Sequence, residues 1–299
     1  MNKKKTTILV SDSGLGGLSV FADIASRMKK NSSFEKISMV YFNAWPEQNR
    51  GYNHFPDMKA RAIVFNNAMK AMAEFTPDSI LIACNTLSVV YPFTDFSKKT
   101  SIKVTGIVDH GVRLIYEHLI KNPDSRVVIF GTPTTIGDGS HINGLIKKGI
   151  DPERISTQGC VNLAGKIERA PFSKNVSQMI ETNVKEAALQ IKSFKGKIFA
   201  ALCCTHFGYC AEQFSQTLAK FTLGEVCILN PNTRMAKLAC ETKDTHKIPD
   251  PEIDMKIVSR VFWEESRIRS YGKLLGKVSP QTIEALKKYT WDKDLFQVA

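Results

Sequence analysis

Residues 79–89 read SILIACNTLSV, a run of small and branched apolar residues that ends in a thiol, an amide and a hydroxyl. The length and β-branched content of the apolar part are typical of a buried strand. Residues 197–209, KIFAALCCTHFGY, repeat the arrangement, with Cys204, Thr205 and His206 after the apolar run. Each stretch is therefore predicted to deliver a cysteine and polar neighbours at the point where a strand opens into a loop.

Similar apolar runs recur along the chain with helix-favouring segments between them. Because strands alternate with helices, we predict mostly parallel sheets covered on both faces. Ligands bind such sheets beyond the carboxyl ends of the strands, where Cys84 and Cys204 are expected to lie. The predicted strands are Thr7–Asp12, Ile37–Phe42, Ser79–Cys84, Lys103–Val108, Arg126–Gly131, Arg154–Gln158, Lys197–Cys203 and Glu225–Leu229. The predicted helices lie within Leu15–Lys30, Pro56–Phe75, Gly111–Lys121, Leu163–Lys192 and Gly208–Phe221.

The order of these segments indicates an internal duplication. Asp12 and Thr132 each follow a strand and lie 120 positions apart, and Cys84 and Cys204 are also separated by 120 positions. Equal offsets in the same order predict an α/β fold of two pseudo-symmetric parallel-sheet domains, with the active site in the cleft between them. The expected domains are 1–98 together with 208–240, and 99–207.

After about Cys240 the sequence changes character. ETKDTHKIPDPE, residues 241–252, is polar and contains proline, which is typical of a linker. Two helix-favouring stretches follow, and the second has Ser279 as a candidate N-cap and Pro280 in its first turn. We therefore predict a linker and a C-terminal helical extension over residues 241–299. This extension packs on the body of the protein or on a second subunit, and the second arrangement would make a homodimer.

Bulk composition is that of a globular protein without a membrane segment. The chain has 299 residues, of which 43% are hydrophobic, and a formal net charge of +12. The charge is spread along the chain, and no nucleic-acid-binding module is evident, so neither nucleic acid nor membrane is an expected partner. The basic N-terminus precedes an apolar segment too short for a signal peptide, and seven cysteines then suggest reduced thiols in the cytoplasm.

Two thiols on opposite sides of a cleft suit one kind of reaction. To invert a carbon that carries a hydrogen, an enzyme needs a base on one face and an acid on the other, with the roles exchanged in reverse. A free thiol titrates at about 8.5, so each cysteine needs help from a neighbour. Asp12 belongs to the same half as Cys84, and His206 follows Cys204 by two positions. These two residues are the expected assistants.

The remaining pocket residues would bind the ends of the substrate. Neutral donors and backbone N–H groups at the starts of helices suit carboxylates. The predicted binding side chains are those of Ser13, Asn85, Thr86, Thr132, Thr135 and Thr205. We expect neither a metal nor a cofactor. The spacing of Cys203, Cys204, His206 and Cys210 fits no familiar zinc pattern, and SGLGGLS falls short of a dinucleotide fingerprint.

Five motifs carry a resemblance to a known family. SDSGLGGLSV, ACNTLSV, GTPTTI, QGCVNLAGKIERA and LCCTHF occur in this order within residues 6–240. In this combination the chain resembles the glutamate racemase family, within the cofactor-independent aspartate/glutamate racemase superfamily. The resemblance implies that Cys84 and Cys204 are the catalytic thiols. It implies that Asp12, His206 and Glu168 assist proton transfer, and that the neutral donors named above contact the amino acid.

Three stretches depart from the family pattern: Asn49-Arg50-Gly51, His206-Phe207-Gly208 and Asn230-Pro231. Where family members carry Pro-Tyr-Gly, which lines the pocket for the side-chain carboxylate, this chain has Asn49-Arg50-Gly51. An arginine there pairs with a carboxylate, fills the pocket or points to solvent. Arg50 and Gly51 are included among the predicted substrate-binding residues. The catalytic motifs match the family, while part of the substrate-recognition frame does not.

The favoured hypothesis is a cofactor-independent amino-acid racemase that works by two-base proton transfer. The resemblance makes the interconversion of L-glutamate and D-glutamate the leading reaction, with D-glutamate used for peptidoglycan. A racemase of another amino acid, such as aspartate, is the first alternative. The second alternative belongs to a different class, a non-catalytic ligand-binding protein that keeps the fold without turnover.

Overall fold

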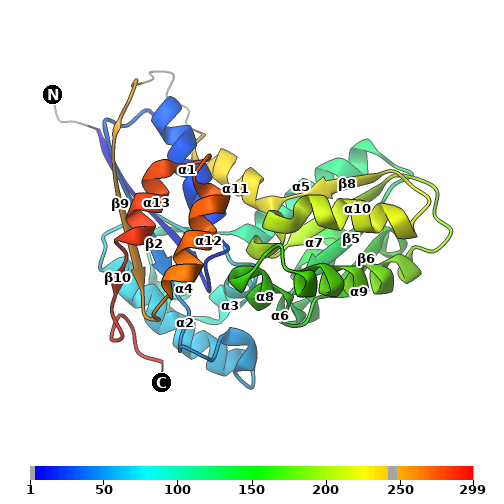
Figure 1. The fold of residues 1–299 in the computed structure, drawn as a ribbon, viewed down its shortest axis with the longest axis horizontal. Helices are drawn as coiled ribbons and strands as arrows, with labels where there is room; N and C mark the ends of the chain where they lie inside the picture. Colours follow the sequence, from blue (N-terminus) through cyan, green and yellow to red (C-terminus); the bar gives the residue numbers. More distant parts are fainter. Residues whose placement is uncertain (1–3, 242–247, 299) are drawn as a thin grey trace. The chain divides into compact units, whose positions relative to one another are not determined.

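The computed structural model describes residues 4–241 and 248–298, which form two compact units (Figure 1). Unit 1 consists of Met1–Gly106 and Met235–Ala299, and unit 2 consists of Ile107–Arg234. Each unit is a parallel sheet with helices on both faces, so the predicted fold class is confirmed. No helix in the described ranges has both the length and the hydropathy that a membrane span requires.

Unit 1 has a six-stranded sheet in the order β10-β9-β2-β1-β3-β4, with every pair parallel. β1 pairs with β2 over eight positions, from Lys5 opposite Lys36 to Asp12 opposite Asn43. Both central strands therefore end together, at the edge of the sheet where Asp12 lies. The strands are β1 (Lys5–Asp12), β2 (Lys36–Asn43), β3 (Ser79–Ile82), β4 (Lys103–Gly106), β9 (Glu252–Ser259) and β10 (Thr290–Trp291).

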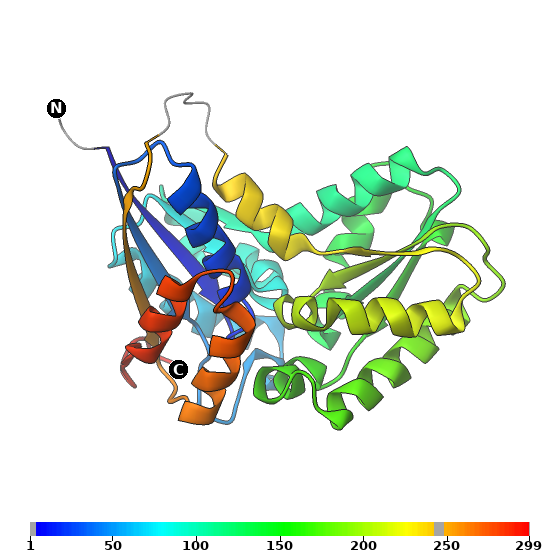
Figure 2. The ribbon, with the colours of Figure 1, turned by 45° about the horizontal axis from the view of Figure 1, so that its top comes forward.

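Helices cover both faces of this sheet (Figure 2). α1 packs against α13 on one face, and α2 packs against α3 and α4. The crossover from β1 to β2 runs toward one edge of the sheet, and the crossovers from β2 to β3 and from β3 to β4 run toward the other edge. Because such crossovers are right-handed, the two groups of helices lie on opposite faces. The helices are α1 (Leu18–Lys30), α2 (Met58–Ala73), α3 (Asn85–Val90), α4 (Asp95–Lys99), α12 (Glu265–Leu275) and α13 (Pro280–Lys287), with α11 (Pro231–Ala239) leading in from unit 2 and the 3-10 helices η1 (Tyr52–His54) and η2 (Tyr91–Phe93).

Unit 2 has a four-stranded parallel sheet in the order β6-β5-β7-β8, the same order as β2-β1-β3-β4 in unit 1. The matching orders agree with the duplication inferred from the 120-residue offsets. Its core packs Phe130 edge-on against Phe214, with ring centroids 5.1 Å apart. The strands are β5 (Arg126–Gly131), β6 (Ile155–Gly159), β7 (Ile198–Cys203) and β8 (Val226–Leu229); the helices are α5 (Ile107–Lys121), α6 (Pro133–Asp138), α7 (Ser140–Lys147), α8 (Leu163–Arg169), α9 (Lys174–Gln190) and α10 (Ala211–Phe221), with η3 (Pro152–Arg154) and η4 (Thr205–Cys210).

The unit boundaries differ from the domain limits expected from the sequence. Residues 99–106 stay in unit 1 because β4 pairs with β3. Residues 208–234, expected in the first domain, belong to unit 2 because α10 packs on α9 and β8 pairs with β7. Pairing and packing partners, which composition does not reveal, set both limits.

The C-terminal segment contains a strand that the sequence analysis did not foresee. β9 pairs with β2 over eight positions, so residues 252–259 extend the sheet of unit 1 instead of forming a helix. Two expected features agree with the structure: α13 begins after Ser279, and the Ser279 side chain accepts a hydrogen bond from the Thr282 N–H. Residues 242–247 of the predicted linker lie outside the described residues.

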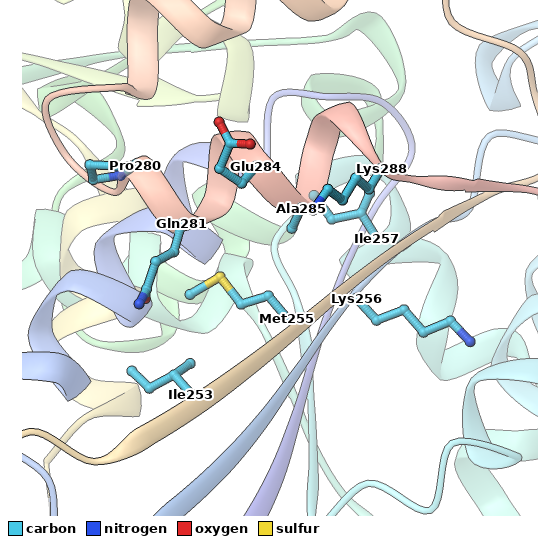
Figure 3. Close-up of a pocket in the computed structure, with 9 residues that line it drawn as sticks. All are labelled: Ile253, Met255, Lys256, Ile257, Pro280, Gln281, Glu284, Ala285 and Lys288. Atoms are coloured by element: carbon cyan, nitrogen blue, oxygen red, sulfur yellow. The ribbon is translucent and has the colours of Figure 1, made fainter.

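Between β9 and α13 lies a groove of about 430 Å³ (Figure 3). Ile253 and Met255 reach from the strand toward the helix, whereas Lys256 points away. This alternation is the period-two pattern of a strand with one covered face. The sequence predicted a helix here, and this strand was missed because covered and exposed side chains alternate over only one short stretch of the segment.

His141 on α7 is a buried side chain that opposes folding at low pH. It is 2% exposed, and neither ring nitrogen has a hydrogen-bond partner among the described residues. Burial lowers the pKa of His141 to about 4. In the unfolded chain a histidine titrates at about 6.5, so the unfolded state binds the proton first as the pH falls. Stability contributed by the neutral ring is complete above pH 6.5 and is lost toward pH 4.

We expect His141→Leu to reduce the pH dependence of unfolding. Between pH 7.5 and pH 5 the wild-type protein should lose about 2 kcal/mol more unfolding free energy than the variant, since the variant has no group there to protonate. Urea unfolding at the two pH values measures the difference, and His54→Leu, at an exposed position, is the control. Equal pH dependence in wild type and His141→Leu would contradict the assignment.

Candidate active site

One cluster of predicted site residues begins with a loop that follows β1 in unit 1. Asp12 ends the strand and is completely buried. The carbonyl of Gly14 accepts hydrogen bonds from the Tyr41 hydroxyl at 2.6 Å and from the Asn43 amide at 2.8 Å. A Cβ atom on Gly17 would lie 2.7 Å from the Cβ of Asp12, so glycine is needed for the loop to close over the carboxylate. Strand β2 thus fixes the loop that carries Asp12.

Cys84 lies at the end of the neighbouring strand β3, as the N-cap residue of α3. Its Sγ is 3.1 Å from the Ser13 Oγ and accepts a hydrogen bond from the Leu87 N–H at 3.4 Å. The side chain is 6% exposed. Because β1 and β3 are adjacent and parallel, their carboxyl ends bring Ser13 and Cys84 into contact.

The environment of Cys84 favours the protonated thiol. Burial, and secondly the negative charge of Asp12, raise the pKa of Cys84 to about 12, although hydrogen bonds from Ser13 and Leu87 oppose the rise. Desolvation disfavours the thiolate because a buried anion loses its hydration. In the free protein, Cys84 is therefore a proton donor that stands beside a carboxylate.

Two further side chains near Cys84 have unsatisfied polar groups. Asn85 is 2% exposed, and neither its amide nitrogen nor its amide oxygen has a hydrogen-bond partner within the described residues. Tyr52 is also 2% exposed, and its hydroxyl likewise has no partner in the described part of the chain. Native proteins rarely leave buried polar groups unpaired, so such groups indicate a ligand site. Asn85 was predicted as a binding residue; Thr86 beside it is buried too.

Sequence reasoning missed Tyr52. Its only signal was its place after Gly51, in a stretch that departs from the family pattern. A lone aromatic residue in a loop gives no indication of whether its hydroxyl faces protein, solvent or ligand. The structure supplies that information through the burial of the hydroxyl.

A separate cluster of predicted site residues lies in unit 2, at the end of β7. Cys204 directly follows the strand, and its Sγ is 3.9 Å from the Nδ1 atom of His206. The Nε2 atom of His206 is 2.8 Å from a carboxylate oxygen of Glu168 on α8. The three side chains form a chain of contacts from thiol to carboxylate. The family resemblance alone had suggested Glu168 as an assistant in proton transfer, and in the structure Glu168 contacts His206.

The pKa of His206 lies well above its ordinary value. Burial alone would lower it, but hydrogen bonds to Cys204 and Glu168, together with the charges of these two groups, outweigh burial. The ring is therefore held as a cation between a thiol and a carboxylate. A buried imidazolium stabilises a neighbouring thiolate, which makes this cluster electrostatically unlike the one in unit 1.

The predicted binding threonines of unit 2 lie at the ends of its central strands. The Thr132 side chain caps α6 after β5, and its Oγ1 is 3.0 Å from the Oγ1 of Thr135. Thr205 follows Cys204 and is 2% exposed, and its carbonyl accepts a hydrogen bond from the Asn232 amide at 3.0 Å. All three threonines are buried beyond the carboxyl edge of the sheet, where the sequence placed them.

Arg50 and Gly51, also predicted to bind substrate, have other contacts in the structure. The Arg50 side chain is 48% exposed, lies 3.6 Å from the Glu47 carboxylate and stacks over the Phe55 ring at 4.3 Å. A Cβ atom on Gly51 would overlap the ring of Trp45, at 2.4 Å from its nearest carbon. Of the three orientations considered for Arg50, the structure has the one directed to solvent.

The other cysteines are packing residues. All seven cysteines are free thiols, and Cys160, Cys203 and Cys210 are buried in the core of unit 2. Burial raises the pKa of each of these three thiols, so they stay protonated. Within residues 4–241 and 248–298, no three metal-binding side chains come together.

In this chain the sheet of unit 2 repeats the order of four strands of unit 1, and in both units a buried cysteine follows a central strand. No family model matches the chain. A glutamate racemase from Vibrio vulnificus (strain CMCP6) is 27% identical over 218 residues, which cover 73% of this chain and 75% of the relative. A glutamate racemase from Helicobacter acinonychis is 26% identical over 275 residues, covering 89% and 98%.

Solved structures have the same fold. A glutamate racemase isoform from Bacillus anthracis aligns with a TM-score of 0.66 at 20% identity, covering 91% of this chain and 94% of the other. The glutamate racemase from Campylobacter jejuni gives a TM-score of 0.66 at 22% identity, covering 90% and 98%. Together with the sequence relatives, these matches show that the chain is similar to glutamate racemases.

The charge of Asp12 can be tested through the reactivity of Cys84. We expect Asp12→Asn to lower the pKa of the Cys84 thiol, because a negative neighbour that disfavours the thiolate is removed. The alkylation rate of Cys84 at pH 8 should rise roughly tenfold for each unit of pKa lost. Mass spectrometry of the Cys84 peptide measures the rate. Asp23→Asn, which removes a carboxylate paired with Arg27 on α1, is the control, and an unchanged rate in Asp12→Asn would contradict the prediction.

Proposed function

We propose that this protein is a cofactor-independent glutamate racemase that interconverts L-glutamate and D-glutamate in the cytoplasm, where D-glutamate serves peptidoglycan synthesis. The curated relatives named above support the reaction. One observation carries the proposal: each of two sheets with equal strand order ends in a buried cysteine that has its own ionisable partner. Such a pair of sites suits a reaction that needs one proton-transfer group on each face of a carbon.

In the proposed mechanism, the Cα of the substrate lies between Cys84 and Cys204. One cysteine, as thiolate, removes the α-hydrogen, so the C–H bond breaks and an S–H bond forms. The other cysteine, as thiol, delivers its proton to the opposite face, so its S–H bond breaks and a new C–H bond forms. The enzyme ends with the two protonation states exchanged, and the reverse reaction restores them.

The partners of each cysteine prepare it for this exchange. Asp12 accepts the Cys84 proton when Cys84 must act as base, and Ser13 stabilises the resulting thiolate by its contact at 3.1 Å. On the other side, the cationic His206 stabilises the Cys204 thiolate, and Glu168 holds the imidazole in place at 2.8 Å. Buried, preorganised groups of this kind act without reorganisation of solvent.

The neutral donors bind the amino acid and stabilise the carbanion-like state. The unpaired amide of Asn85 is the clearest candidate, since bound substrate would satisfy both its nitrogen and its oxygen. Ser13, Thr86, Thr132, Thr135 and Thr205 supply hydroxyl groups from the same strand ends. The mechanism assigns no role to a cofactor or metal. It also does not depend on the homodimer considered for the C-terminal segment.

A racemase of another amino acid, such as aspartate, is the second candidate. It is favoured by Arg50, whose exposed side chain stands where family members carry a pocket tyrosine. A chiral assay of the purified protein over a panel of amino acids separates the candidates. Turnover of glutamate above all others supports the first, turnover of aspartate with none of glutamate supports the second, and no α-hydrogen exchange with any amino acid rejects both.

Replacement of either cysteine tests the two-thiol mechanism. We expect Cys84→Ser and Cys204→Ser each to lower kcat for glutamate racemisation by at least about 10³-fold, because a serine hydroxyl is a far weaker acid than a thiol. Chiral chromatography of the product measures the loss. Cys240→Ser in unit 1 and Cys227→Ser in unit 2, which change partly buried thiols, are the matched controls. Substantial activity in either test variant would contradict the mechanism.

The contact between Glu168 and His206 predicts a change in the pH profile. Glu168→Gln removes a charge that raises the pKa of His206, so the imidazolium is lost at lower pH. The alkaline limb of kcat should therefore move to lower pH, with about tenfold less activity at pH 8. Glu186→Gln, which changes a glutamate of unit 2 that is bonded to Gln158, is the control. An alkaline limb in the wild-type position would contradict the assigned role.

A further inference from the structure

We propose that the hydroxyl of Tyr52 is a specificity-determining group of this site, donating a hydrogen bond to the side-chain carboxylate of the bound amino acid. The inference rests on the proposed function, because it assigns a ligand to a residue beside the proposed catalytic thiol. The sequence predicted Arg50 and Gly51 as binding residues in this loop. The Arg50 side chain contacts Glu47 and is exposed, and Gly51 has no side chain to offer.

The first argument is the burial of an unsatisfied hydroxyl. The Tyr52 ring packs edge-on against Phe65 on α2, with centroids 6.1 Å apart, and lies 6.1 Å from the Phe55 ring. Its hydroxyl is buried and has no hydrogen-bond partner among the described residues. Buried tyrosine hydroxyls normally find a partner, because an unpaired one costs free energy. A ligand that supplies the partner removes this cost.

Tyr41 shows what a purely structural tyrosine looks like in the same unit. It is completely buried, like Tyr52, but its hydroxyl donates to the Gly14 carbonyl at 2.6 Å. Within the described part of the chain, one buried phenol thus has a protein partner and the other has none. This contrast argues that the Tyr52 hydroxyl is used by something outside the chain.

The second argument is the location of Tyr52. It begins η1 and packs on α2, and α2 packs on α3, whose N-cap residue is Cys84. Arg61 holds this loop by donating to the carbonyls of Tyr52 and Phe55, at 3.1 and 3.0 Å. Its guanidinium is thus committed to the backbone. The loop is anchored from α2, so the Tyr52 ring has a fixed direction.

The third argument is the protonation state of the phenol. Burial, and secondly the charge of Cys84, raise the pKa of Tyr52 well above its ordinary value. The hydroxyl therefore remains a donor throughout the physiological range, and a carboxylate is the ligand group that such a donor favours most. Asn85 and Ser13 adjoin the thiol that acts on Cα, which leaves the distal carboxylate for Tyr52.

Tyr52→Phe removes the hydroxyl and keeps the ring. We expect KM for glutamate to rise roughly 10- to 100-fold, the range for a hydrogen bond to a charged group, with kcat within about threefold of wild type. The melting temperature of the free protein should stay the same or rise, because no protein hydrogen bond is lost. Tyr41→Phe, the matched control, should lower the melting temperature because its hydroxyl has a partner.

Norvaline, a neutral amino acid of similar length, identifies the carboxylate that Tyr52 binds. Its inhibition constant against glutamate should be equal in wild type and Tyr52→Phe. An unchanged KM for glutamate in Tyr52→Phe would overturn the proposal, and an equal rise for glutamate and norvaline would overturn the assignment to the side-chain carboxylate.

The glutamate-dependent rise in melting temperature separates this inference from the proposed function. If wild type does not racemise glutamate, the proposed function fails. A thermal shift by glutamate in wild type that is lost in Tyr52→Phe would still support Tyr52 as a carboxylate ligand. A shift equal in both proteins, or absent from wild type, would reject that role.

Discussion

Burial of a thiol beside an ionisable group is the constraint on which the rest of this structure depends. The strands of a parallel sheet all end at one edge, and in each unit the cysteine lies at that edge. Ser13 of the loop after β1 contacts Cys84, and His206, two positions further along the same segment, contacts Cys204. Water is largely excluded there, so the charge states of the cysteines are set by their protein neighbours. The glycine loop closed over Asp12, with its carbonyl held by β2, exists to keep such a neighbour in place.

The two units place different ionisable groups near their cysteines, although four strands have the same order in both sheets. Cys84 stands beside a carboxylate, which favours the thiol, whereas Cys204 stands beside a histidine held as a cation by Glu168. A duplicated fold has therefore acquired opposite electrostatics at equivalent positions. This asymmetry places a negative charge that favours the thiol near one cysteine and a cation near the other.

Much of this was readable from the sequence, because it depends on local pattern. Eight strands were located from apolar β-branched runs, and Cys84, Asn85, Cys204 and Thr205 were placed at strand ends by simple adjacency. The strand at 252–259 was missed because its pairing partner, β2, is more than 200 positions away and only one face of the strand is covered. The unit boundaries were missed for the same reason, since helix packing and strand pairing set them.

Side-chain direction was the other limit. Nothing in Asn49-Arg50-Gly51-Tyr52 indicates that Arg50 turns to Glu47 and Phe55 while Tyr52 turns inward. Burial and hydrogen-bond accounting, which need coordinates, distinguish the two. The contact of Glu168 with His206 is similar: 38 positions separate them, and only the family resemblance connected them before the structure did.

The central claim, that one thiol acts on each face of a single carbon, is tested most directly by racemisation of L-glutamate in heavy water. At early times the account predicts that the D-glutamate formed carries deuterium at Cα, while the remaining L-glutamate keeps its original hydrogen. D-glutamate that retains the substrate's own α-hydrogen would show that a single group both removes and returns the proton, and would contradict the account.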